Sequence, residues 1–184
     1  MTSAKALSGT VWDADPLEHN TDSRVVLELY DREQDSLRRY AVWIGVDFET
    51  AEEVVQETFL KLHQHLLAGG DRSHLRAWLF RVAHNLVRNS QSSSHRARTT
   101  TLADFDMLAQ MPAGQASAED ELLDREQQKR LRNAMNVLSP AQKSCLVLRA
   151  EGLKYREIAD TLGLSVSTVA ENVQRGLERL KENV

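Results

Sequence analysis

The sequence has few of the residues that build disulfides, metal sites and membrane-spanning segments. Its 184 residues include one cysteine, three prolines and eight glycines. Because Cys145 is alone, it cannot form an internal disulfide, and one thiol does not make a metal site. No apolar run approaches the roughly 18 residues that cross a bilayer, and no signal peptide opens the chain. These absences predict a cytoplasmic protein that is not inserted into a membrane.

Motifs typical of enzymes are also missing. The sequence contains no Gly-rich phosphate-binding loop ending in Lys-Ser/Thr, and no nucleophile with a supporting base. His63 and His65 are two residues apart on a predicted helix, so they point in different directions and do not form a metal-binding pair. We therefore expect a protein that is not an enzyme and that uses no cofactor and no metal.

Charge is distributed unevenly along the chain. The formal net charge of −4 argues against a free-standing, strongly basic DNA-binding protein. Residues 72–98, however, hold six arginines, three histidines and no acid, whereas residues 104–126 hold seven acids and one base. A basic block followed by an acidic segment makes a polarised molecule.

The apolar pattern predicts an all-α protein made of two small helical domains. Residues 1–22 show no sustained period and are predicted to be a flexible leader, and 99–120 a flexible acidic linker. A first helical domain is predicted over 23–98 and a second over 121–184. The helices of the first domain are expected to begin near Arg24, at a capping box formed by Thr50 and Glu53, and after a cap at Ser73. The predicted apolar stripes comprise Val26, Tyr30, Leu37, Ala41 and Ile44, then Ala51, Val55, Phe59, Leu62 and Leu66, then Leu75, Leu79, Val82 and Leu86.

The second domain carries the pattern of a helix-turn-helix. Ser139-Pro140 is a strong helix start, and Gly163 can take the left-handed conformation that ends a helix. The predicted inward residues are Leu123, Leu131, Met135 and Leu138 of a first helix and Val169, Val173, Leu177 and Leu180 of the last. Such a motif places a recognition helix in the major groove of DNA, although an ordinary αα-hairpin would show part of the same pattern. The residues expected to face DNA are Ser167, Thr168, Glu171, Asn172, Gln174 and Arg175.

Two segments together resemble a known family. AEEVVQETFLKLHQHL with AWLFRVAHNLVRN resembles region 2, and LSPAQKSCLVLRAEGLKYREIADTLGLSVSTVAENVQRGLERL resembles region 4, of extracytoplasmic-function bacterial sigma factors. The resemblance implies an alternative sigma factor that directs core RNA polymerase to −10 and −35 promoter elements and helps to melt the DNA. It also implies regulation by an anti-sigma factor bound between the two domains.

The resemblance assigns one surface to the polymerase. It implies that Glu53, Gln56 and Glu57, with Lys61 beside them, bind the clamp helices of the largest subunit. Carboxylates and an amide suit a basic helical partner. The alternative is a solvated helix face on which Glu53 serves only as the acid of a capping box.

A second surface is assigned to the unpaired −10 strand. With Leu79, Val82 and Leu86 inward, Arg81, Asn85 and Arg88 fall on the opposite face, beside the loop GGDRSHL. The resemblance implies that a flipped base is captured there, with Asn85 helping to hold it. Trp78 could stack on a base or pack in the core, and His84 could contact phosphate or be a bystander. The residues expected to bind −10 DNA are Arg72, Ser73, Arg81, His84, Asn85, Arg88 and Asn89.

Departures from the family pattern leave other functions open. The stretch NSQSSSHRAR stands where the family often has a dense arginine run. In the recognition helix, Ala170 and Asn172 stand where basic residues are common in the family, and Glu171 adds an acid. Asn172 or Gln174 is a candidate for bidentate contacts to adenine. A weak recognition helix would also fit a decoy that sequesters an anti-sigma protein, and a plain DNA-binding repressor is a third possibility.

Overall fold

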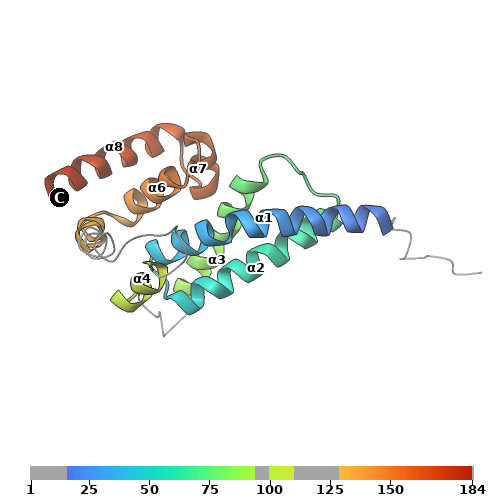
Figure 1. Ribbon diagram of the computed structural model, residues 1–184. Coiled ribbons are helices and arrows are strands. Elements are labelled where there is room, and N and C mark those ends of the chain that lie inside the picture. The colour runs from blue at the N-terminus through green and yellow to red at the C-terminus, as the bar shows by residue number, and fades with distance from the viewer. Residues whose placement is uncertain (1–15, 94–99, 110–128, 184) are drawn as a thin grey trace, which may run out of the picture.

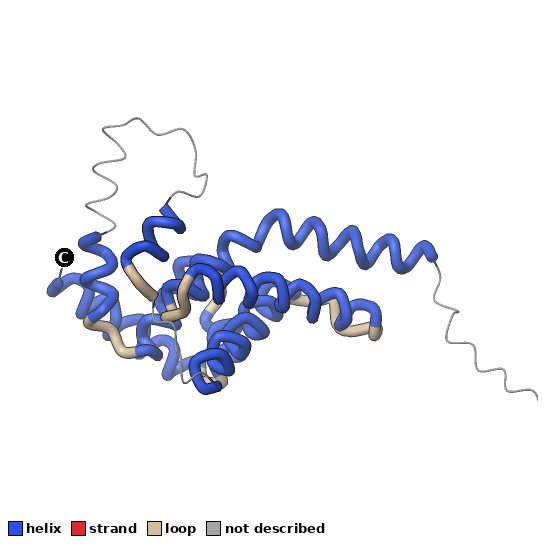
Figure 2. The backbone as a smooth tube through the Cα atoms, turned by 90° about the horizontal axis from the view of Figure 1, so that it is seen from below, coloured by secondary structure: helices blue, strands red, loops and turns tan. Residues whose placement is uncertain are grey.

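The computed structural model describes residues 16–93, 100–109 and 129–183, and the regular elements within these ranges are helices (Figures 1 and 2). This confirms the predicted all-α class. No helix in these ranges is long and apolar enough to cross a membrane. A further helical stretch, 129–136, precedes α6. The labelled elements are α1 (Pro16–Trp43), α2 (Phe48–Leu67), α3 (Leu75–Ser93), α4 (Leu102–Ala109), α6 (Pro140–Ala150), α7 (Tyr155–Leu162) and α8 (Val166–Asn183).

The first module is a bundle of α1, α2 and α3, with α1 and α2 lying side by side as the two longest helices (Figure 1). The two helices run antiparallel, because contacts join Arg38 to Glu52 and Tyr30 to Phe59. Apolar side chains from all three helices fill the centre of this bundle. Those with no exposed surface are Leu37, Tyr40, Ala41, Val42, Ala51, Leu62, Leu79, Phe80, Ala83 and Val87.

The helix starts in this module differ from the sequence-based expectation. The first helix begins at Pro16, eight residues before Arg24, so the predicted boundary of the leader at residue 22 is wrong. Asp22 is buried and pairs with Arg72, a partner 50 residues away that local periodicity does not reveal. The N-cap of α2 is Asp47, whose carboxylate accepts the N–H of Thr50 at 2.7 Å, and not Thr50 itself.

Part of the predicted linker is an ordered helix. In α4, Asp104 accepts the N–H of Phe48 at 2.8 Å and the N–H of Thr101 at 2.6 Å. Phe105 packs on Trp43 with 4.8 Å between ring centroids. Residues 100–109 of the expected linker therefore belong to the first module, whereas residues 99 and 110–120 lie outside the described part of the chain.

The second module contains the predicted helix-turn-helix. Ser139 caps α6 in a capping box with Gln142, and Gly163 ends α7 with φ +66°, which confirms both expectations. The predicted inward positions Leu131 and Leu177 are wrong, since these side chains are 44% and 47% exposed. The last helix instead approaches α6 at the buried Gly176, where a Cβ would lie 2.7 Å from the side chain of Leu146.

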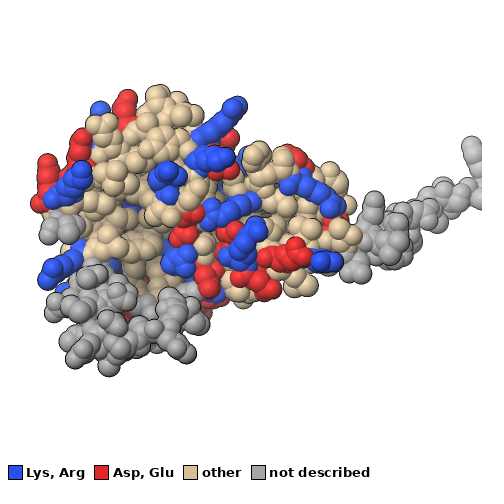
Figure 3. Space-filling model, turned by 45° about the horizontal axis from the view of Figure 1, so that its top comes forward, with Lys and Arg blue, Asp and Glu red and all other residues tan. Residues whose placement is uncertain are grey.

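The two modules pack on each other. Contacts join α3 to α7 and α1 to α6 (Figure 1). On the face shown in Figure 3, basic and acidic side chains lie beside one another across the molecule and do not form a patch of a single sign.

Candidate partner and nucleic-acid interfaces

One face of α2 presents the residues expected to bind a partner. Its buried stripe faces α1 and α3, which leaves Glu53 and Gln56 exposed on the opposite side. Glu57 and Lys61 form an i,i+4 ion pair of 3.0 Å, and their side chains are 43% and 42% exposed. The helix thus brings together all four residues predicted from the sequence.

Sequence reasoning missed one member of this face. Leu60 is 51% exposed, although it stands within an apolar-rich stretch. It lies four residues after Gln56 and three after Glu57, so it shares their side of the helix. The spacing alone could have identified it. An exposed leucine within an acidic stripe provides apolar area for a partner that also carries basic groups.

The outer face of α3 is basic and amide-bearing, as expected. Arg81, Asn85, Arg88 and Asn89 are exposed. The buried side differs from the predicted stripe, since Phe80, Ala83 and Val87 are buried whereas Val82 and Leu86 are only partly so. The buried side of α3 differs from the predicted one because α3 packs against α1 and α2 on one side and against α7 on another.

The structure corrects the expectation for His84. Its ring is 9% exposed and lies 2.7 Å from the Tyr40 hydroxyl. Burial, with a smaller contribution from the positive charge of Arg88, lowers the pKa of His84 to about 4. A neutral, buried imidazole does not contact phosphate, so the bystander alternative is the one that the structure supports.

The loop before α3 is held by contacts with the first module. Arg72 pairs with Asp22 and keeps 51% of its side chain exposed. Ser73 does not cap α3; its N–H and its hydroxyl donate to the carboxylate of Asp71 at 2.8 and 2.5 Å. The predicted loop residues are therefore near the start of α3, with Arg72 already engaged by a carboxylate.

His65 supports this loop, a role that the sequence did not indicate, since the residue was weighed there only as a metal ligand. Its ring stacks on Trp78 with 4.8 Å between centroids, and its Nε2 lies 3.0 Å from the carbonyl oxygen of Asp71. A Cβ added to Gly70 would lie 2.2 Å from the same ring. Trp78 therefore packs beside the loop through the His65 ring, and a larger residue at Gly70 would displace that imidazole.

The recognition helix α8 has most of its polar groups engaged within the helix. Ser165 caps it by accepting the N–H of Thr168 at 3.1 Å, and the Ser167 and Thr168 hydroxyls lie 2.8 Å from the Ser165 hydroxyl. The Asn172 amide donates to the carbonyl of Thr168 at 2.9 Å.

The remaining polar residues of this face also pair along the helix. Gln174 donates to Glu178 at 3.1 Å, and Arg175 lies 3.6 Å from Glu171. Ser167, Glu171, Gln174 and Arg175 are exposed, whereas Thr168 and Asn172 are half-buried. No group of three or more metal-ligating side chains occurs among the residues that the structure describes.

Comparison with known proteins places these surfaces in a family. Residues 29–97 match the family model for Sigma-70 region 2, and residues 128–180 match Sigma-70 region 4. The chain is 31% identical to the RNA polymerase sigma factor YlaC of Bacillus subtilis over 74% of this chain and 78% of that protein. It is 30% identical to the ECF RNA polymerase sigma factor EcfG of Rhodopseudomonas palustris, covering 79% of this chain and 77% of that one.

Two solved structures share the fold. CnrH, in complex with the cytosolic domain of CnrY, matches with a TM-score of 0.62 at 23% identity over 90% of this chain and 91% of that one. The sigma factor RpoE of Bartonella quintana, in complex with the anti-sigma factor NepR, matches with the same score and identity over 86% and 96%.

The chain is thus a sigma factor of the Sigma-70 class. It belongs to the extracytoplasmic-function family of RNA polymerase sigma factors, which direct core polymerase to promoters.

Proposed function

We propose that the chain initiates transcription in the cytoplasm as a non-catalytic subunit, using three separate surfaces. The face of α2 binds the clamp helices of core polymerase, the outer face of α3 holds the unpaired −10 strand, and α8 reads the −35 duplex. The observation that carries this proposal is the exposure of Gln56 and Asn85 on different helices of one bundle. A single body can then contact the enzyme and the melted DNA together.

The polymerase contact follows from the chemistry of α2. Glu53 and Glu57 provide carboxylates for a basic partner, Gln56 provides an amide, and Leu60 adds apolar area. Interfaces of this kind combine electrostatic steering with an apolar anchor. The ammonium of Lys61 lies 3.0 Å from the Glu57 carboxylate and neutralises part of its charge. Glu53 lies one helical turn before Glu57 and is not part of that ion pair.

The −10 contact follows from the outer face of α3. Arg81 and Arg88 can hold phosphates, because they are exposed guanidiniums on a helix face without acids. Asn85 lies between them, one helical turn from each, and offers a donor and an acceptor to a base edge. An unpaired base held there offsets the few kcal/mol that unstacking costs. Melting by capture of this kind needs no ATP.

Reading of the −35 duplex is assigned to the exposed end of α8. Arg175 and Gln174 are exposed there, but each already has a partner on the helix. The Asn172 amide is bonded to its own backbone, so Gln174 is the stronger candidate for contact with adenine. We expect Gln174→Ala to relax base preference at one promoter position, and Asn172→Ala to do so less.

We further propose an anti-sigma partner for this chain. Two proteins with the same fold were solved with such regulators or with a cytosolic domain bound. The chain also has two modules joined through 110–128, so a partner could bind between them.

Run-off transcription with purified core polymerase tests the whole proposal. A library of random promoter sequences, transcribed by the reconstituted holoenzyme, should yield enriched templates with two spaced elements. Core polymerase alone is the control. If the chain bound core but gave no promoter-specific product, a decoy function would replace initiation. If the chain bound duplex DNA but not core polymerase, a repressor function would replace initiation and the decoy function alike.

A further inference from the structure

A cavity of about 290 Å³ lies where α3, α6 and the end of α7 meet. Its apolar walls are formed by Ile44, Val87, Leu162 and Leu164. The lining also includes Gln91, which is exposed, so the cavity opens to solvent. Its volume is at the lower end of the range for small-molecule sites, which are mostly apolar and carry a few placed polar groups. The cavity therefore has the size and the walls of a site for a small ligand.

Two basic side chains line this cavity without a carboxylate partner. Arg88 of α3 and Lys143 of α6 form no ion pair with any residue that the structure describes. Burial lowers the pKa of the half-buried Lys143, and no neighbouring carboxylate opposes that effect. Among the described residues, the lining includes no aspartate or glutamate. An anion in the cavity would therefore meet positive charge that the chain itself does not neutralise.

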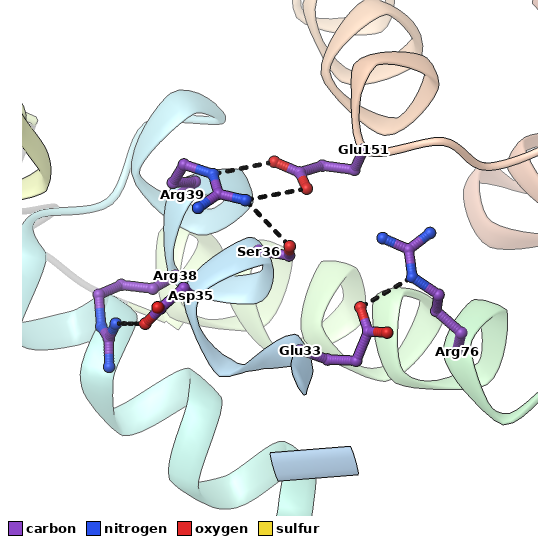
Figure 4. A network of polar contacts seen from close by, with 7 residues as sticks. All are labelled: Glu33, Asp35, Ser36, Arg38, Arg39, Arg76 and Glu151. Carbon is purple, nitrogen blue, oxygen red and sulfur yellow. Dashed lines mark hydrogen bonds and ion pairs between the residues drawn. The ribbon is translucent and has the colours of Figure 1, made fainter. Parts of the chain in front are cut away.

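Two carboxylates elsewhere along the boundary between the modules are already paired. Glu151, at the end of α6, accepts from Nε and Nη2 of Arg39, both at 3.2 Å (Figure 4). Glu33 of α1 accepts from Nε of Arg76 at 2.7 Å (Figure 4). Neither carboxylate belongs to the lining of the cavity. The two basic groups of the cavity are thus left for an anion from outside the chain.

A buried histidine adds a third hydrogen-bond donor. His84 lines the cavity and is 9% exposed, and its Nδ1 lies 2.7 Å from the hydroxyl of Tyr40. The buried phenol proton needs an acceptor, which Nδ1 provides. The single proton of the neutral ring is then on Nε2, which has no partner in the described part of the chain. An oxygen acceptor in the cavity would satisfy this nitrogen.

We propose that the cavity binds a small carboxylate with an apolar chain. The ammonium of Lys143 and the guanidinium of Arg88 hold the carboxylate, with Nε2 of His84 as a further donor, and the chain of the ligand packs on the apolar walls. A phosphate suits the cavity less well, because its second charge costs more to remove from water beside apolar walls. Arg88 also belongs to the proposed −10 surface, but binding of the carboxylate does not depend on that role.

An NMR titration of the full-length chain with hexanoate tests the site. The chain has two isoleucines, so labelled isoleucine methyl groups give two signals. Ile44 lines the cavity, whereas Ile158 is fully buried in the second module. Hexanoate should shift the signal of Ile44 to saturation and leave that of Ile158 in place. Hexanol, hexylamine and inorganic phosphate should shift Ile44 little, because each lacks the negative charge or the apolar chain.

Three variants assign the binding to the cavity. Lys143→Gln should weaken hexanoate binding by at least about tenfold, because it removes a charged hydrogen-bond donor. Ala141→Phe, at an exposed position of the lining, should block the cavity without a change of charge. Lys181→Gln is the matched control, because it removes the same charge from an exposed position of α8 and should bind hexanoate like the wild type.

The proposal is overturned if hexanoate leaves the Ile44 signal unmoved in the wild type. It is equally overturned if Lys143→Gln and Lys181→Gln bind hexanoate with the same affinity while circular dichroism shows intact helices. Equal shifts of Ile44 with hexanol and hexanoate would show an apolar cavity that does not recognise charge, and would reject the carboxylate site. None of these measurements uses polymerase or promoter DNA, so their outcome is separate from that of the proposed function.

Discussion

The hydroxyl oxygen of Tyr40 and Nδ1 of His84 are hydrogen-bonded at 2.7 Å, which joins α1 to α3 inside the protein. Tyr40 has no exposed surface, and burial raises the pKa of its hydroxyl far above the ordinary value. Both partners are therefore neutral at pH 7. A neutral imidazole has one donor and one acceptor, so it satisfies a buried hydroxyl without a buried charge.

Acidification should destabilise the protein through His84. Its pKa is about 4 in the folded state and 6.5 ordinarily, so the unfolded chain binds more protons between these values. Stability that is present above pH 6.5 is lost as the pH falls toward 4. We expect the free energy of unfolding to fall by about 2 kcal/mol between pH 7 and pH 5 from this group, as measured by urea denaturation.

The variant His84→Gln provides the control for this pH dependence. Glutamine keeps a donor and an acceptor but does not titrate, so its unfolding free energy should vary less over the same range. The same pH dependence in both proteins would assign the effect to other groups.

Loss of the Asp104 carboxylate should release α4. Burial alone would raise the pKa of Asp104, but hydrogen bonds from Phe48 and Thr101 outweigh it and hold that pKa below the ordinary value. We expect Asp104→Asn to lower the free energy of unfolding by about 1 to 3 kcal/mol, because the amide has one accepting oxygen where the carboxylate has two for the N–H groups of Phe48 and Thr101. Urea denaturation measures this. Asp31→Asn, at an exposed position of α1, should have little effect.

The double variant Gln56→Ala with Glu57→Ala should weaken binding to core polymerase. Loss of two interface side chains is expected to reduce affinity about tenfold or more, measured by fluorescence anisotropy with labelled sigma factor. Helicity should be unchanged, because neither side chain is buried. Gln64→Ala, also exposed on α2, is the control. A large loss of helicity in the double variant would show that this face is structural.

Asn85→Ala should impair promoter opening more than promoter binding. If Asn85 holds a flipped base, its loss should reduce open complexes by about tenfold while closed complexes persist. Permanganate footprinting and gel shifts measure the two steps. Arg81→Ala should instead weaken both steps and reduce their salt dependence, because it removes a phosphate contact. Equal loss of both steps in Asn85→Ala would rule out base capture.

Glu171→Gln should strengthen binding of the −35 duplex. The ion pair between Glu171 and Arg175 is exposed, with 63% and 68% of the side chains accessible, and such i,i+4 pairs are weak. Removing the acid leaves Arg175 available to phosphate, so holoenzyme affinity should rise about twofold to fivefold at low salt. A salt titration of promoter binding measures this. Lower affinity in the variant would mean that Glu171 contributes a favourable contact.

Sequence reasoning succeeded where the cause is local. Ser139 with Pro140 defined a helix start, and Gly163 defined a turn, because caps and positive φ depend on a few adjacent residues. The exposed positions of α2 followed from helical spacing. The prediction failed for α3, where His84 is buried. A helix that packs against neighbours on several sides buries more of its circumference than a single apolar stripe in the sequence indicates.

The sequence by itself determined the helical class, the helix-turn-helix and the face of α2 that bears Gln56, because each is written in residues within a few turns of one another. Only the tertiary structure decided that Asp22 pairs with Arg72, that Asp104 caps against Phe48 and that Arg39 meets Glu151. These pairs are 50, 56 and 112 residues apart. No local period encodes which distant charge a side chain will meet, since that depends on how the helices pack.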